Sequence, residues 1–243
     1  MIAICSSVLL SLFVARVYSE PDALFNPCHK DDIKCLSEAT EAFLSKTYGG
    51  VEQWGIKPID PLVIPSEEVV VDEDLGLAFH FKNTHVTGLK NLRIADFKMD
   101  TKQRSVLLKM SADVSVTADM DVKLTKSQKT FSGPYTAATT VHGTSEYGYS
   151  LKKINGTEYF EVGKETSTCE ITEDPVITIG TELKNIIDTD EDAKSLKPEW
   201  ELKKQALRKK ALCKIVGRGF ETVMQNLRTA ATLLPKSAFF HGI

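Results

Sequence analysis

The strongest constraint on the fold of this chain is a C-terminal stretch that predicts one very long helix. Pro198 suits a first helical turn, and no proline follows it until Pro235. The stretch would form a helix of about 37 residues, roughly 55 Å long, with Gly217 and Gly219 indicating close packing or a bend near its middle. Its apolar residues spread over much of the circumference: Leu202, Ala206, Leu207, Ala211, Leu212, Ile215, Val216, Phe220, Val223, Leu227, Ala231 and Leu234. Such a helix must be covered from more than one side, so the rest of the chain is expected to wrap around it.

The region before this helix alternates apolar and polar residues, which predicts β-strands. The alternation runs from Val69 to Ile179 and is clearest between Val106 and Leu124. A period of two with one apolar face is typical of antiparallel strands that cover a core. Asn155-Gly156 lies between two such runs and predicts a two-residue hairpin turn. We therefore expect the α+β class, with a highly curved antiparallel sheet around the long C-terminal helix.

A short amphipathic helix is predicted nearer the N-terminus. Residues 35–48 carry apolar side chains on one helical face, and Gly49-Gly50 ends the helix. These side chains belong to Leu36, Ala39, Ala42 and Phe43. Pro58, Pro61 and Pro65 then exclude a helix and favour an extended edge strand or a loop.

The composition is that of a folded, mildly acidic globular protein. Hydrophobic residues make up 42% of the 243 residues, and this length allows one large domain or two small ones. With 30 basic and 33 acidic side chains the formal charge is −3, which argues against binding to nucleic acid. The basic runs at residues 203–204 and 208–210 are expected on the solvent face of the long helix.

The N-terminus predicts export. Ile2–Ala15 is an apolar run without charge, too short to span a bilayer but suited to the core of a secretory signal. Val17 and Ser19 are small enough to direct cleavage after Ser19. No Lys or Arg precedes the run, and a buried N-terminal helix is the alternative. We predict a signal peptide at residues 1–19 and a single secreted domain at residues 20–243.

Four cysteines remain after this cleavage, which in an oxidising compartment predicts two disulfides with three possible connectivities. Cys28–Cys35 with Cys169–Cys213 is the economical choice, because the first pair is local and the other two cysteines lie on elements that could pack together. A zinc site is the weaker alternative, since no Cys-x-x-Cys motif is present and His29 is the only histidine near either pair.

Taken in order along the chain, these features resemble one family. They are the signal peptide, the Cys28-x6-Cys35 pair opening a short helix, the segment GIKPIDPLVIP, the long alternating strands and the long C-terminal helix. This order is similar to that of the insect haemolymph juvenile hormone-binding proteins, a branch of the takeout-like family, over essentially the whole mature chain. The second pair, Cys169 with Cys213, resembles the hormone-binding branch more than the takeout branch.

The resemblance implies both a fold and a function. The fold would be one long helix wrapped by a highly curved sheet, similar to one half of the lipid-transfer proteins, with the short N-terminal helix near the ligand entrance. The function would be that of a secreted haemolymph carrier, which solubilises, protects and transports juvenile hormone in an enclosed hydrophobic pocket. Juvenile hormone is a sesquiterpenoid with a methyl ester at one end and an epoxide at the other.

Tyr147 is the candidate polar residue of such a pocket. It shares the more apolar face of one strand, expected to point inward, with Val141, Gly143, Ser145, Tyr149 and Leu151. Its phenol could donate a hydrogen bond to an epoxide or ester oxygen, with Tyr149 as the substitute. The alternative is a core tyrosine that is hydrogen-bonded to the backbone.

The two ends of the mature chain could close the pocket. Leu36, Ala39 and Phe43 form the inner face of a gate helix, or only pack that helix down. The C-terminal segment is unusually apolar for a tail, so Phe239 and Phe240 are expected to dock against the first helix as a latch.

Further apolar residues are candidates for the pocket wall. Trp54, beside Ile56, could line an entrance, or could be a core or surface-anchoring residue. Phe220 and Val223 lie on the long helix, which a tunnel in this architecture should adjoin, and plain core residues are the alternative.

No catalytic motif is recognisable, so we expect no enzyme activity, no cofactor and no metal. Asn155 opens the sequon Asn155-Gly156-Thr157 and could carry a glycan at an exposed hairpin tip, although the turn alone would explain Asn-Gly. A carrier of another apolar ligand, such as a fatty acid or odorant, is the second functional hypothesis. A membrane- or lipopolysaccharide-binding protein is the third.

The expected partner is a small apolar ligand bound by a monomer. Neither nucleic acid nor stable membrane insertion is expected, and a cell-surface or haemolymph protein is a further candidate partner.

Overall fold

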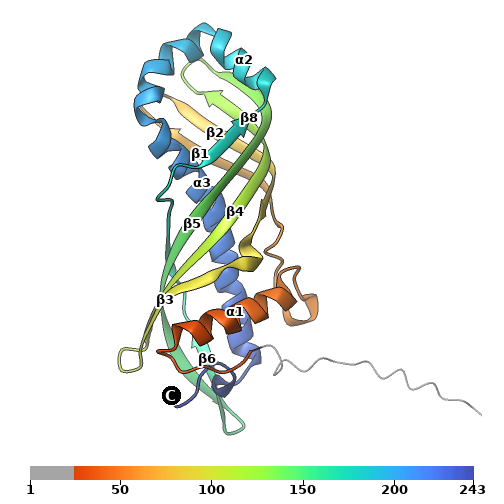
Figure 1. The fold of residues 1–243 in the computed structure, drawn as a ribbon, viewed down its shortest axis with the longest axis vertical. Helices are drawn as coiled ribbons and strands as arrows, with labels where there is room; N and C mark the ends of the chain where they lie inside the picture. The colour runs from red at the N-terminus through yellow and green to blue at the C-terminus, as the bar shows by residue number, and fades with distance from the viewer. Residues whose placement is uncertain (1–24) are drawn as a thin grey trace, which may run out of the picture.

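An eight-stranded antiparallel sheet curls around one long helix in the computed structural model, which describes residues 25–243 (Figure 1). This is the architecture that the sequence predicts. The predicted signal peptide at residues 1–19 lies outside the described residues. The strands are β1 (Leu62–Asp72), β2 (Leu77–Thr87), β3 (Arg93–Asp100), β4 (Ser105–Leu124), β5 (Lys129–Ile154), β6 (Thr157–Val162), β7 (Thr166–Glu170) and β8 (Val176–Ile179). The helices are α1 (Ile33–Thr47), α2 (Thr181–Thr189) and α3 (Glu191–Leu233), with single 3-10 turns at Glu52–Trp54, Leu89–Asn91 and Lys236–Ala238.

Two long strands, β4 and β5, form the frame of the sheet. They pair without interruption from Ser105 opposite Gly148 to Leu124 opposite Lys129. β2 and then β1 extend one half of β4, and β3 pairs with its other half. β8, β7 and β6 pair with successive parts of β5, so the composition of the sheet differs between the two ends of the molecule.

The predicted alternation is confirmed along β4. Every second residue from Val106 to Leu124 is buried, and most residues between them are exposed or half-buried. Asp121 is the exception, a buried carboxylate that accepts a hydrogen bond from Ser132 Oγ at 2.7 Å and pairs with Lys82 Nζ at 2.9 Å. The buried residues of β4 and those of α3 belong to one hydrophobic cluster, so the core lies between the sheet and this helix.

The predicted extended edge is also confirmed. Pro65 lies in β1, which pairs with β2 alone, so its missing N–H costs no hydrogen bond to a second neighbour. The register passes from Ile64 opposite Thr84 to Ser66 opposite Lys82, and Pro65 has no partner of its own.

The long helix begins earlier than predicted. α3 spans 43 residues from Glu191, so the prediction that it starts at Pro198 is wrong. Asp190 supplies the N-cap, because its carboxylate accepts hydrogen bonds from the amides of Asp192 and Ala193. Pro198 lies inside the helix, where its missing N–H leaves one carbonyl without a helical donor. Figure 1 shows α3 changing direction in this N-terminal part before it runs along the sheet.

Two further expectations for α3 have different outcomes. Close packing at its middle is confirmed at Gly219, where a Cβ would come within 2.6 Å of Leu89 Cδ1, whereas Gly217 faces open space. The expected apolar surface is wrong at its N-terminal part, since Leu202 is 82% exposed and Ala206 is exposed as well. The apolar residues that point inward there are instead partly buried Leu196 and Trp200.

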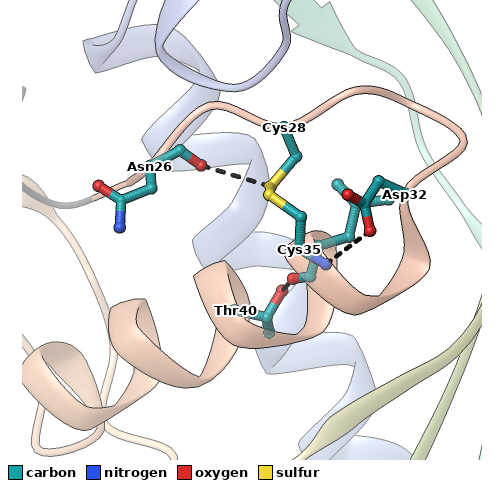
Figure 2. The surroundings of a disulfide bond; sticks show 6 residues. Asn26, Cys28, Asp32, Cys35 and Thr40 are labelled. Carbon is teal, nitrogen blue, oxygen red and sulfur yellow. Dashed lines mark hydrogen bonds between the residues drawn. A yellow bond between two sulfur atoms is a disulfide. The ribbon is translucent and has the colours of Figure 1, made fainter.

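Both predicted disulfides are present. Cys28–Cys35 joins the segment before α1 to the first turn of that helix, where Asp32 Oδ1 accepts a hydrogen bond from the Cys35 amide at 3.0 Å (Figure 2). Cys169–Cys213 joins β7 to α3. The first bond therefore fixes the entry to α1, and the second fixes the sheet against the long helix.

Candidate ligand-binding site

An apolar cavity of about 130 Å³, here called the α1 cavity, lies where α1, the sheet and the C-terminal part of α3 meet. α1 contributes its inner face, as the gate hypothesis expected. β3, β4, β5 and β6 contribute further walls, and the C-terminal tail completes the lining. Almost all lining side chains are aliphatic or aromatic, so the cavity suits an apolar ligand.

Six of the predicted site residues meet in this cavity. They are Leu36, Ala39, Phe43, Tyr147, Tyr149 and Val223. They come from α1, β5 and α3, which are far apart in the sequence, and the curl of the sheet brings them together (Figure 1).

The other three predicted residues lie outside the lining. Ile56 is buried in the main core and Trp54 packs against that core. Phe220 is 1% exposed and lies against Gly143, where a Cβ would come within 2.9 Å of its ring. Phe220 therefore fills the middle of the molecule, and the absence of a side chain at Gly143 makes the room for it.

Tyr147 points into the cavity, as its place on the apolar face of β5 predicted. Its hydroxyl has no hydrogen-bond partner among residues 25–243, so the alternative of a core tyrosine bonded to backbone does not hold. Burial raises the pKa of Tyr147 further above neutral pH, so the phenol is a hydrogen-bond donor there, as an ordinary tyrosine would be. The cavity thus contains a hydrogen-bond donor that a ligand oxygen could use. The ring of Tyr149 also lies at the cavity, 5.3 Å from that of Phe160.

The expected docking of the tail is confirmed in its geometry. The Cys28 amide donates to the Phe239 carbonyl at 3.0 Å, and the His241 amide donates to the Cys28 carbonyl at 2.9 Å. Phe239 and Phe240 both line the cavity. Phe240 packs against the cluster of Cys28, Leu36 and Ala39, which includes the inner face of α1.

An aromatic cluster continues this closure. The ring of Phe25 stacks on Phe43 of α1 at 4.5 Å and lies 4.9 Å from Phe239. Phe160 on β6 contacts both Phe239 and Phe240 at centroid distances of 6.1 and 5.9 Å. The N-terminal segment, α1 and the tail therefore close one end of the cavity together.

Asn226 is a lining residue that the sequence analysis missed. Its side chain is buried and pairs with the backbone of Lys57, whose N–H donates to Oδ1 and whose carbonyl accepts from Nδ2, both at 2.8 Å. This pair fastens the loop after α1 to α3. The sequence did contain a signal for Asn226, since it is a lone asparagine on an apolar helical face. A buried amide needs a hydrogen-bond partner, so this position predicts a polar contact in the core.

A second apolar cavity, here called the distal cavity, lies at the opposite end of the sheet. It has a volume of about 220 Å³ and is bounded by the ends of β2, β4 and β5, by β8 and α2, and by the N-terminal part of α3. No sequence pattern predicted this cavity.

Within residues 25–243 no group of three or more His, Cys, Asp and Glu side chains is arranged to hold a metal ion. In the same part of the chain, no helix has the length and apolarity needed to cross a membrane.

Comparison with known proteins agrees with the fold. Residues 5–173 match the family model of the haemolymph juvenile hormone binding proteins. The chain is 43% identical over 228 residues to a juvenile hormone-binding protein of Manduca sexta, a match that covers 93% of this chain and 100% of that protein.

The chain belongs to the haemolymph juvenile hormone binding protein family. The crystal structure of takeout 1 from Epiphyas postvittana has the same fold, with a TM-score of 0.70 at 17% identity, covering 89% of this chain and 99% of that one. The resemblance inferred from the sequence is therefore confirmed at the level of family and fold, and the two disulfides agree with it.

Proposed function

We propose that this protein is a secreted carrier of juvenile hormone and that the α1 cavity holds the hormone. The observation that carries the proposal is the free hydroxyl of Tyr147 inside an apolar cavity. Juvenile hormone is apolar along its length, with an epoxide oxygen and ester oxygens as acceptors at its ends. One inward donor in an apolar wall matches this distribution, and membership of the family supports the same ligand.

The α1 cavity supplies affinity through its walls and selectivity through its donor. A ligand of about 20 heavy atoms at about 0.4–0.5 kcal/mol per atom would bind with about 8–10 kcal/mol, a dissociation constant between micromolar and tens of nanomolar. The free acid of the hormone would bring a charge into an apolar site, and the epoxide-opened diol would bring hydroxyls that need partners. Both changes carry a desolvation cost, so the intact hormone would be preferred.

The ends of the chain would control access. α1 would act as the gate, and the tail would act as the latch because Phe239 and Phe240 cover both the cavity and the inner face of α1. Closure of this end would bury the hormone until a receptor or cell surface favoured release.

The proposal extends to processing and cellular location. Residues 1–19 would be removed as a signal peptide, and residues 20–243 would form one domain that circulates as a monomer in haemolymph. Asn155 would carry a glycan, because it is exposed in the turn between β5 and β6 with φ of 50° beside Gly156 with φ of 89°. The protein would carry the hormone unchanged rather than convert it.

Equilibrium binding of juvenile hormone to the secreted, oxidised protein tests the proposal. The free acid, the diol and a fatty acid serve as competitors. Submicromolar binding of the hormone, with weak competition by acid and diol, is the expected result. Absent hormone binding, or equal competition by the fatty acid at the same site, would refute a hormone carrier and favour a general carrier of apolar ligands.

A further inference from the structure

The distal cavity has the right lining for a ligand but a different chemistry from the α1 cavity. Its inner wall is apolar and includes Phe79, Met120 and Ile179. Its remaining lining includes the charged side chains of Lys184, Asp188, Lys197, Glu201 and Arg208. An apolar interior next to charged side chains is suited to an amphiphile rather than to a wholly apolar molecule.

The charges at this rim do not cancel. Asp188 pairs with Lys197 at 3.4 Å, and Glu201 pairs with Lys204 at 2.5 Å. Lys184 and Arg208 have no ion pair within residues 25–243, and Arg208 lies over the ring of Trp200 at 5.8 Å. Each of the two acidic side chains thus has a lysine partner, although Arg208 also contributes to lowering the pKa of Glu201. Lys184 and Arg208 remain without a paired carboxylate and can face a ligand. The basic run at residues 208–210 predicts a solvent-facing Arg208, whereas the structure places this side chain at the cavity.

Tyr135 adds a donor on the inner side of Arg208. Its side chain is 5% exposed, its ring lies 5.2 Å from that of Phe81, and its hydroxyl has no hydrogen-bond partner in the part of the chain that the structure describes. Tyr135 and Arg208 both line the distal cavity. Burial raises the pKa of Tyr135, and the positive charge of Arg208 acts in the opposite direction. The Tyr135 hydroxyl is therefore free to donate a hydrogen bond to an acceptor placed in the cavity.

We propose that the distal cavity is a second ligand site, which binds a single-chain amphiphile with an anionic head, of the fatty-acid class. The carboxylate accepts hydrogen bonds from Arg208 and Tyr135, and the alkyl chain fills the apolar interior. Charge-assisted hydrogen bonds to a guanidinium give this site its preference for the anion. The α1 cavity and the distal cavity lie at opposite ends of the molecule, so both ligands bind at once. This inference does not depend on which ligand the α1 cavity takes.

Trp200 makes the site directly observable. The chain contains two tryptophans, and Trp200 lines the distal cavity while Trp54 lines neither cavity. In the mature, oxidised Trp54→Phe protein, indole fluorescence therefore reports on Trp200 alone. Laurate and its methyl ester are the two probes, because they share the alkyl chain and differ in head-group charge. We expect laurate to change the fluorescence saturably, and the methyl ester to bind at least about tenfold more weakly.

Variants in the same background assign this preference to the proposed groups. Arg208→Gln should reduce laurate affinity about tenfold and abolish the preference over the ester, and Tyr135→Phe should reduce it severalfold. Arg218→Gln is the matched control, since Arg218 lies on the same helix and pairs with Glu67 and Glu221 away from this cavity. It should leave laurate binding unchanged. Thermal unfolding of each variant shows that it is folded.

A competition experiment separates this proposal from the hormone proposal. Laurate that saturates the Trp200 signal should not displace labelled juvenile hormone. Equal affinity for laurate and ester, unchanged laurate binding by Arg208→Gln, or displacement of the hormone in proportion to the Trp200 signal would each overturn the second site. Laurate binding without any hormone binding would leave this site standing and refute the hormone carrier instead.

Discussion

At the scale of single residues, the hydroxyl of Tyr147 is the group whose removal tests the α1 cavity most directly. Tyr147→Phe keeps the ring and removes the donor, so hormone affinity should fall about 2–12-fold, corresponding to about 0.5–1.5 kcal/mol for one hydrogen bond. Equilibrium binding measures the change. Tyr48→Phe is the control, because Tyr48 is 40% exposed and outside the cavity lining. An unchanged affinity in Tyr147→Phe would remove this hydroxyl from the site.

Gly143 tests how tightly the middle of the molecule is packed. A Cβ there would lie 2.9 Å from the ring of Phe220, so Gly143→Ala should lower the free energy of unfolding by about 1–3 kcal/mol. Gly148→Ala in the same strand is the matched control, since its nearest neighbour would be a backbone oxygen at 3.7 Å. Urea denaturation compares the two. Equal stability of both variants would show that Phe220 shifts at little cost.

At the scale of elements, the tail has the contacts expected of a latch. Deletion of residues 236–243 removes Phe239 and Phe240 from the lining of the α1 cavity, and with them the backbone bonds to Cys28. The hormone should then dissociate severalfold faster, because one wall of the cavity becomes open to water. Stopped-flow displacement measures the rate. Deletion of Gly242 and Ile243 alone keeps these contacts and should leave the rate unchanged. Equal rates for all three proteins would contradict the latch.

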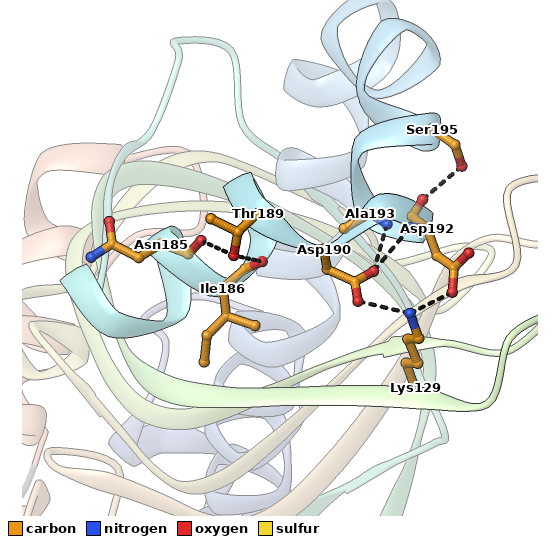
Figure 3. A network of polar contacts seen from close by, with 8 residues as sticks. All are labelled: Lys129, Asn185, Ile186, Thr189, Asp190, Asp192, Ala193 and Ser195. Carbon is orange, nitrogen blue, oxygen red and sulfur yellow. Dashed lines mark hydrogen bonds and ion pairs between the residues drawn. The ribbon is translucent and has the colours of Figure 1, made fainter.

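The start of α3 should depend on pH, because one ion-pair network holds it (Figure 3). Lys129 Nζ lies 2.7 Å from a carboxylate oxygen of both Asp190 and Asp192. The hydrogen bond from Lys129, followed by that from the Ala193 amide, holds the pKa of Asp190 below its usual value, and the same network raises the pKa of Lys129. Because the pKa of Asp190 is lower in the folded protein than in the unfolded chain, where it is about 3.9, the ionised carboxylate stabilises the fold at pH values above about 3.9. This contribution is lost as pH falls through the pKa of the folded protein.

The first turn of α3 should therefore lose hydrogen-exchange protection at the amides of residues 192–193 as pH falls below about 4, after correction for the intrinsic exchange rate. Asp190→Ala should show low protection there at neutral pH already, because it lacks the cap as well as the ion pair. Asp188→Asn alters a neighbouring carboxylate that pairs with Lys197 instead, and should retain the pH dependence. Protection that stays constant from about pH 6 to about pH 3 in the unaltered protein would contradict this role of the network.

The elements were predictable to the extent that local periodicity determines them. The alternation in β4 and the Asn155-Gly156 turn follow from the sequence, since each depends on neighbouring residues alone. The start of α3 could not be predicted in this way, because a proline inside a helix has the same local pattern as a proline at the first turn of a helix. The same limit applies to the site. The inward direction of Tyr147 follows from the strand periodicity. In contrast, Phe220 packs in the core and not in the cavity wall because Gly143, which is distant in the sequence, leaves room for its ring.

At the scale of the whole molecule, the two disulfides should separate stability from ligand retention. In the chain-entropy model, opening Cys169–Cys213, with a sequence separation of 44, should cost about 4 kcal/mol. Opening Cys28–Cys35, with a separation of 7, should cost about 2.5 kcal/mol. Cys28–Cys35 holds the segment to which the tail is hydrogen-bonded, whereas Cys169–Cys213 joins β7 to α3 away from the α1 cavity. Paired Cys→Ser variants should therefore show opposite orders in two measurements. The 169/213 variant should lose more free energy of unfolding in urea, and the 28/35 variant should release the hormone faster. If one variant leads in both measurements, closure of the cavity follows overall stability, and α1 and the tail have no separate role as a gate.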